Sequence, residues 1–362
     1  MIRYPFLSLS LVCASFLFSY GQLRTEAFQF SYDSLTYQGY LDYPQDQDPE
    51  AWIVLIPGSG QTDFGGTSGW NKWFMRLRTN FVDQGLGVCM WDRPGCGKSE
   101  GSFDPNQSVH SSAEEALAAI ETIRSKALPG TDQIGLWGMS RGGWICPLII
   151  QADSTVDFWI TVSGVDSLEN SNYLLETNLK LLGYSGQRAA QLVQEKRKGT
   201  QIFLQGGSYQ EYLAATQNVR ADSFYLAMFG VHWEEKAYVE NQQAFLQSDE
   251  PSPLRDGVKD PIALPGFTHI IQSVRCPVLA IFGEKDSQVN WRDAQILYEA
   301  TLMDRAPLEI VSFPDCNHTL MQCETGAVFE NLEKFGYADC GGYHAAMNDW
   351  LGRIVRKKQP ND

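Results

Sequence analysis

The sequence predicts an α/β fold in which a doubly wound, mostly parallel sheet carries an inserted, mainly helical cap. Short, continuously apolar runs that end in Gly, Asp, Ser or Asn are typical of strands covered on both faces. Amphipathic stretches of helical period separate these runs, and strands that alternate with helices form parallel sheets. The stretch 166–272 interrupts the alternation without a comparable strand.

The sheet is expected to begin with an antiparallel edge hairpin, because AFQFSYDS and LTYQGYLDYP alternate apolar and polar residues on either side of a turn. Buried parallel strands should follow. The runs that predict them are AWIVLIPGSG (51–60), GVCMWDRPG (87–95), IGLWGMS (134–140), FWITVSG (158–164), CPVLAIFGEKD (276–286) and LEIVSFPDCNH (308–318).

Helices are expected between these strands, at 69–84, 110–127, 141–152, 291–304 and 342–357. The second of them offers Ser111 or Ser112 as its N-cap, with Glu114 or Glu115 in the first turn. Residues 166–272 contain helical patterns rich in Gln, Glu, Tyr and Leu. We interpret this range as a helical cap inserted into a sheet domain made of 22–165 and 273–362.

The first residues have the character of a secretory signal peptide, 1–21. An apolar run at 5–19 follows Arg3, and small residues precede a cut ahead of Gln22. The run is nearer 15 residues than the ~20 that a spanning helix needs. We therefore expect a secreted or periplasmic protein without stable membrane insertion after cleavage. An uncleaved anchor and a lipid-modified Cys13 are the alternatives.

In an exported protein the cysteines can form disulfides. Removal of Cys13 from the eight leaves seven, an odd number that cannot all pair internally. Cys89 and Cys146 lie in apolar runs and are expected in the core. A cluster late in the chain, Cys316, Cys323 and Cys340, predicts one disulfide. No compact spacing supports a zinc site there, and no metal is expected.

The charge of the chain restricts its partners. Among 362 residues, 28 Lys and Arg stand against 43 Asp and Glu, a formal net charge of −15. Nucleic acids and anionic membranes are poor partners for such a surface. The charge favours neutral or cationic small molecules over a polyanion such as coenzyme A as partners.

The motif G-x-S-x-G occupies residues 138–142, between a predicted strand and a predicted helix. It follows the apolar run IGLW and precedes GGWICPLII, which is the strand–turn–helix setting of a nucleophile elbow. The pattern predicts that Ser140 is a nucleophile. A serine hydroxyl needs a base and a group that orients the base.

The base is expected in the loop after the last strand, which leaves His318 and His344 among the five histidines. We favour His318, because it directly follows the run LEIVSF and its loop, whereas His344 belongs to the terminal helix. The acid should end the preceding strand. Asp286, three residues after Gly283, is the first choice and Glu284 the reserve.

An oxyanion formed on the substrate needs main-chain donors. The N–H of Arg141, next to the serine, is one of them. The loop PGSGQ (57–61) is expected to supply the second from Ser59, with Gly60 the next choice.

Taken in order, the segments IPGSG, WDRPGCGKSEG, GLWGMSRGGW, FGEKDSQV and NHTLMQCETG resemble those of the α/β-hydrolase superfamily, over residues 25–165 and 275–357. Within it the chain is similar to bacterial exported esterases and to the acyl-CoA thioesterase-like or serine aminopeptidase-like branch. The resemblance implies a serine hydrolase without a cofactor that acts on a small-molecule ester through an acyl-enzyme.

Three other functions stay open. An aminopeptidase would need a cap carboxylate for the substrate amine, and Glu234 and Glu235 are the candidates. A thioesterase of the same fold and a catalytically silent binding protein are the others. Aromatic residues that could line a pocket, or simply pack in the core, are Trp144, Tyr225, Phe229 and Trp233. Acyl and alcohol preference and oligomeric state do not follow from the sequence.

Overall fold

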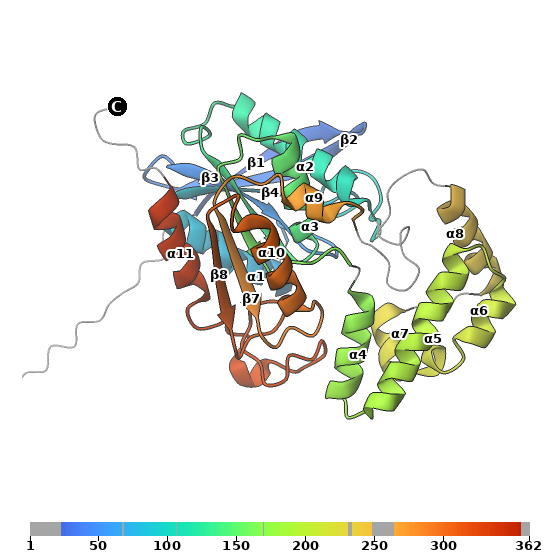
Figure 1. Cartoon of the computed structure of the whole chain (residues 1–362). Coiled ribbons are helices and arrows are strands. Elements are labelled where there is room, and N and C mark those ends of the chain that lie inside the picture. Colours follow the sequence, from blue (N-terminus) through green and yellow to red (C-terminus); the bar gives the residue numbers. More distant parts are fainter. Residues whose placement is uncertain are drawn as a thin grey trace, which may run out of the picture.

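An eight-stranded sheet forms the centre of the computed structural model, which describes residues 23–66, 69–105, 107–168, 170–230, 234–247 and 264–355 (Figure 1). The predicted signal peptide lies outside the described residues. The strand order is β1-β2-β4-β3-β5-β6-β7-β8. The strands are β1 (Leu23–Tyr32), β2 (Leu35–Pro44), β3 (Ala51–Ile56), β4 (Leu86–Trp91), β5 (Ile134–Met139), β6 (Phe158–Val162), β7 (Val278–Gly283) and β8 (Leu308–Phe313).

The predicted mostly parallel sheet is confirmed. β1 and β2 form the expected antiparallel hairpin, and β2 also pairs antiparallel with β4. From β4 to β8 every neighbouring pair is parallel. All residues of β3 to β7 are buried, as expected for strands with helices on both faces. The same expectation is wrong for β8, which is the edge strand of the sheet and has no fully buried residue. Parallel strands bring their carboxyl ends to one edge, where the loops of the candidate site lie.

Helices cover the two faces of the sheet unequally. One face packs against α2 (Val109–Ser125), α3 (Gly142–Ala152), α9 (Phe267–Ile271) and α10 (Trp291–Leu302). The other face packs against α1 (Gly69–Asp83) and α11 (Tyr343–Ile354). The five helices predicted between strands are present, each with ends within three residues of the expectation.

The predicted N-cap of α2 is wrong. Ser108 caps the helix, because its side-chain oxygen accepts from the N–H groups of His110 and Ser111. Ser112 instead lies buried inside the first turn. Glu115 is also buried, so it does not serve as an exposed acid at the helix start.

The predicted cap range contains α4 (Ser171–Leu181), α5 (Gly186–Leu204), α6 (Tyr209–Ala215), α7 (Ser223–Phe229) and α8 (Glu235–Gln247). These helices stand together beside the sheet domain (Figure 1). Leucines of α4 and α5 form a separate small core with residues of α7. The range also contains α9, which packs against α3 and α10 because Phe267, Ile270 and Ile271 are buried there.

The cysteines divide as the sequence indicates. Cys316 and Cys340 form a disulfide, whereas Cys323 is buried and free. Cys89 and Cys146 are fully buried in the core. In the part of the chain that the structure describes, no helix combines the length and the apolar character needed to cross a membrane.

Candidate active site

Ser140 occupies the sharp turn between β5 and α3. Its φ of +51° is unusual for a residue with a side chain, and nucleophile elbows hold their serine on a strained turn of the same strand–turn–helix kind. The N–H of Ser140 donates to the carbonyl of Val162 at 3.0 Å. A Cβ on Gly138 would lie 2.5 Å from Sγ of Cys146 and 2.9 Å from the carbonyl oxygen of Gly142, so the turn requires glycine there.

His318 and Asp286 lie in contact after β8 and β7. Nδ1 of His318 is 2.7 Å from Oδ2 of Asp286, and both residues are buried. The other predicted candidates lie elsewhere. The Glu284 carboxylate accepts from Oγ of Ser312 at 2.7 Å, and Nε2 of His344 is 3.1 Å from an oxygen of Asp339.

Both loops are held by side chains that sequence reasoning missed. Oγ of Ser163, after β6, donates to the carbonyl of His318 at 2.6 Å. From α4, the hydroxyl of Tyr173 donates to the carbonyl of Asp286 at 3.0 Å. Nδ2 of Asn178 donates to the carbonyl of Ser287 at 3.1 Å. The only signal was an asparagine amid the leucines of NYLLETNLKLL.

Ser140 and His318 line one cavity of about 680 Å³. The predicted oxyanion residues Ser59 and Arg141 line it as well. The backbone there is close to the serine, since a Cβ on Gly58 would lie 3.3 Å from Cβ of Ser140. Through the contact between His318 and Asp286, the structure therefore brings together all five residues predicted for the site.

The wall of this cavity is largely apolar and comes from both parts of the chain. The sheet domain contributes Trp144 among others, and the cap contributes Phe229. Tyr225 instead packs in the small core of the cap, and Trp233 lies outside the described residues. Further apolar lining residues are Phe74, Phe103, Met139, Val165, Leu174, Met228 and Val289.

The carboxylates considered for an aminopeptidase are not in this wall. Glu234 and Glu235 are exposed at the start of α8, and neither lines the cavity. Arg141 and His318 are the only Arg, Lys, His, Asp or Glu residues among the described residues that line it. The guanidinium of Arg141 donates to the carbonyl of Gln107 and to Oγ of Ser112.

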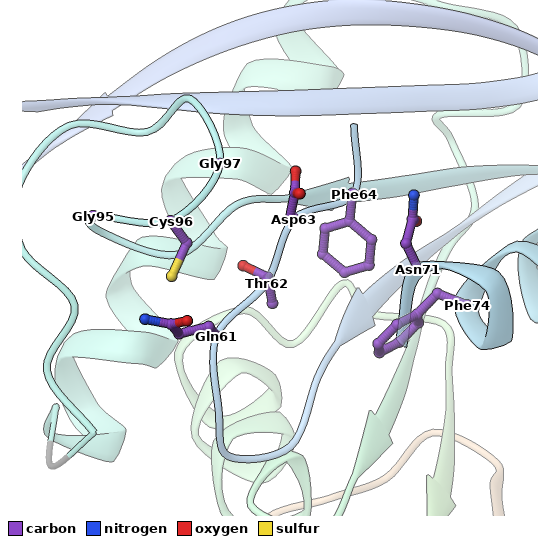
Figure 2. A pocket seen from close by; sticks show the side chains of 9 residues that line it. All are labelled: Gln61, Thr62, Asp63, Phe64, Asn71, Phe74, Gly95, Cys96 and Gly97. Atoms are coloured by element: carbon purple, nitrogen blue, oxygen red, sulfur yellow. The ribbon is translucent and has the colours of Figure 1, made fainter. Parts of the chain in front are cut away.

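A second cavity, of about 550 Å³, lies beside the first. Figure 2 shows residues 61–64 between the loop of Gly95, Cys96 and Gly97 on one side and Asn71 and Phe74 on the other. Gln61, Thr62 and Phe74 line both cavities. The loop WDRPGCGKSEG thus borders the site through Gly95, Cys96 and Gly97. Within the described ranges, no group of three or more His, Cys, Asp or Glu is placed to hold a metal.

The comparisons with known proteins agree with this architecture. The model of the Alpha/beta hydrolase family matches residues 53–330, and no protein of curated function matches the sequence. The Pyrococcus furiosus esterase Pf2001 is similar in structure, with a TM-score of 0.52, 14% identity and 92% of each chain covered.

Two further structures share the fold. The Pyrococcus horikoshii acylaminoacyl peptidase has a TM-score of 0.51 at 11% identity, and the match covers 94% of this chain and 43% of the peptidase. DcsB in complex with its substrate analogue has a TM-score of 0.51 at 16% identity, with 92% and 99% covered. Such identities show the fold alone, whereas the family model spans more than half of the chain: the chain belongs to the alpha/beta hydrolase family.

Proposed function

We propose that the chain is a serine hydrolase that cleaves carboxylic esters with Ser140, His318 and Asp286. One observation carries the proposal. His318 is bound to a buried carboxylate at 2.7 Å and lines the same cavity as a serine held at a positive φ. A base oriented in this way beside a serine hydroxyl is the arrangement that nucleophilic acyl transfer requires.

The mechanism follows from these positions. Nε2 of His318 takes the proton of Ser140 as the hydroxyl attacks the ester carbonyl, and Asp286 stabilises the imidazolium without taking the proton. The N–H groups of Ser59 and Arg141 donate to the oxyanion. His318 then protonates the departing alcohol. Water, activated by the same histidine, releases the acid from the acyl-enzyme.

The substrate that fits this site is a small, uncharged ester. The cavity wall is mostly apolar, and burying a charge against apolar side chains is costly. The net charge of −15 further disfavours nucleic acid as a partner. We also propose export after removal of the signal peptide 1–21, with the mature enzyme acting outside the cytoplasm.

Hydrolysis of p-nitrophenyl butyrate tests the proposal. Ser140→Ala should abolish turnover, because the variant has no nucleophile. Ser171→Ala is the matched control, since Ser171 also lines the cavity but lies on α4, and it should keep turnover within about threefold. Unchanged turnover in Ser140→Ala would exclude the assignment.

A substrate panel separates the rival functions. The same butyryl group offered as an oxygen ester and as a thioester compares esterase with thioesterase. An aminoacyl p-nitroanilide tests for aminopeptidase activity. A fluorophosphonate probe should label Ser140, and a folded protein that resists this probe would be a binding protein rather than an enzyme.

A further inference from the structure

A buried polar network lies beneath the proposed oxyanion hole. Arg93 follows β4, Gln107 precedes α2, Glu115 lies on α2, and Arg141 follows the nucleophile. The side chains of Arg93, Glu115 and Arg141 are almost completely buried. Apart from the main chain of Arg141, none of these residues has a part in the mechanism above.

Arg93 holds the loop that contains Ser59. Its Nη1 donates to the carbonyl of Gly60 at 2.8 Å, and its main-chain N–H donates to Oγ1 of Thr62 at 2.7 Å. Gly60 has a φ of +109°, a conformation that residues with a side chain disfavour. The two bonds from Arg93 therefore fix a part of the loop that glycine alone leaves free to move.

Gln107 connects this loop to the second donor. Its Oε1 accepts from Nη2 of Arg93 at 3.0 Å. Its main-chain carbonyl accepts from Nη2 of Arg141, which also donates to Oγ of Ser112 at 3.0 Å. One residue therefore contacts the arginine that holds the Ser59 loop and the arginine whose N–H follows Ser140.

The two buried guanidinium groups are only partly compensated by nearby carboxylates. Glu115, which is buried, and Asp104, which is exposed, both act on the two arginines through their charge. The hydrogen bonds of Glu115 come instead from Nε1 of Trp91 and from Nε2 of Gln107 at 2.9 Å. Burial lowers the pKa of Arg93 and, together with the charge of Arg93, that of Arg141. Two buried cations on neighbouring segments cost stability, so their presence needs a reason other than stability.

The ring of Phe103 covers Arg93. The guanidinium carbon lies 5.2 Å from the ring centroid, and Phe103 lines the active-site cavity whereas Arg93 does not. Arg93 therefore acts on a substrate only indirectly, through the loop that contains Ser59 and through the electric field of its charge.

We propose that Arg93, through its bonds to Gly60 and Gln107, is a positioning residue that sets the geometry of both arms of the oxyanion hole. The inference rests on the proposed esterase function. An unfixed loop would still admit the substrate, but its N–H groups would stabilise the transition state less well, so kcat should fall while KM changes little.

The test uses Arg93→Met with p-nitrophenyl butyrate. We expect kcat to fall about 10²-fold, the usual effect of losing one oxyanion donor, with KM within about threefold. Added guanidinium should restore part of kcat, because it can refill the vacated site. Arg124→Met is the control: Arg124 also pairs with a carboxylate, that of Asp153, but it lies in the last turn of α2, away from the cavity wall, and its kcat should be unchanged.

Gln107→Leu provides a second route if Arg93→Met does not fold. It removes the bonds to Arg93 and Glu115 while its main-chain carbonyl still accepts from Arg141, and kcat should fall about tenfold. A stable Arg93→Met or Gln107→Leu protein with wild-type kcat, or a loss confined to KM, would overturn the inference while leaving the esterase assignment intact. Wild-type protein without Ser140-dependent turnover would overturn both.

Discussion

Replacing Asp286 with Asn should move the ring proton of His318 from Nδ1 to Nε2. Oδ1 of Asp286 accepts from the N–H groups of Gln288 at 2.8 Å and Val289 at 2.9 Å, while Oδ2 faces Nδ1 of His318. The two N–H groups need an acceptor, so the carbonyl oxygen of the new amide will take the place of Oδ1. The NH₂ group of the amide then faces Nδ1, which has to accept rather than donate. The proton moves to Nε2, and His318 loses the lone pair that should receive the proton of Ser140.

The size of the effect follows from this tautomer. A wrong tautomer in a Ser-His-Asp triad lowers kcat about 10⁴-fold, which corresponds to ~5.4 kcal/mol of transition-state stabilisation. KM should change less than about threefold, since Asp286 does not line the cavity. The amide in Asp286→Asn would still bind both loop N–H groups, so the loss of folding free energy should stay near that of one charged hydrogen bond, about 1.5–3 kcal/mol.

Steady-state hydrolysis of p-nitrophenyl butyrate measures both parameters, and urea unfolding measures the stability. Glu284→Gln is a matched control, because it removes a carboxylate from the same loop whose partner is Ser312 rather than His318. Its kcat should stay within about twofold. A kcat in Asp286→Asn above about one tenth of wild type, or an equal loss in Glu284→Gln, would refute this role of the acid.

Three further predictions concern the framework of the site. Replacing Cys316 and Cys340 together by Ala should lower the free energy of unfolding by ~3.5 kcal/mol, from the loop closed over a separation of 24 residues; a change below ~1 kcal/mol in urea titrations would contradict it. Gly138→Ala should cost at least ~2 kcal/mol and lower Tm, because the new methyl group overlaps Sγ of Cys146; a wild-type Tm would show that the turn tolerates it. Burial raises the pKa of Asp339, but hydrogen bonds from Arg76 on α1 and from His344 outweigh this effect and lower the pKa from 3.8 to about 2. The contribution of Asp339 to the free energy of unfolding is therefore present above pH 4 and is lost as the pH falls through 2. Asp339→Asn should therefore destabilise by ~1–2 kcal/mol at pH 7 and approach wild type as the pH falls below the lowered pKa of about 2, and an equal loss at pH 7 and below pH 2 would contradict the lowered pKa.

The fold was predictable because strand and loop signals are local. Continuous apolar runs marked the buried strands, and the residues at their carboxyl ends, Ser140, Asp286 and His318, had to meet at one edge of a parallel sheet. The choice of Asp286 over Glu284 depended only on position along one loop. The contact of 2.7 Å between Asp286 and His318 agrees with that choice.

Contacts between distant side chains were not predictable. Arg93 and Gln107 lie 14 residues apart with Gly60 still further away, and no periodicity marks such a set. The N-cap of α2 failed for a related reason: Ser108, Ser111 and Ser112 are equivalent by residue type. Tertiary contacts decide among them, since Ser112 is taken up by the guanidinium of Arg141.

Helix α4 both lines the cavity and supports Asp286. Its substitutions can therefore change substrate specificity and displace Asp286 at the same time. Tyr173 and Asn178 on this helix bind the main chain of residues 286 and 287, whereas Leu174 on the same helix lines the cavity. Substitutions at Leu174 therefore risk moving the support of Asp286. Met228, at the end of α7, lines the cavity from a helix without such bonds among those described. Changes of acyl preference at constant kcat should thus be obtained more readily at Met228 than at Leu174.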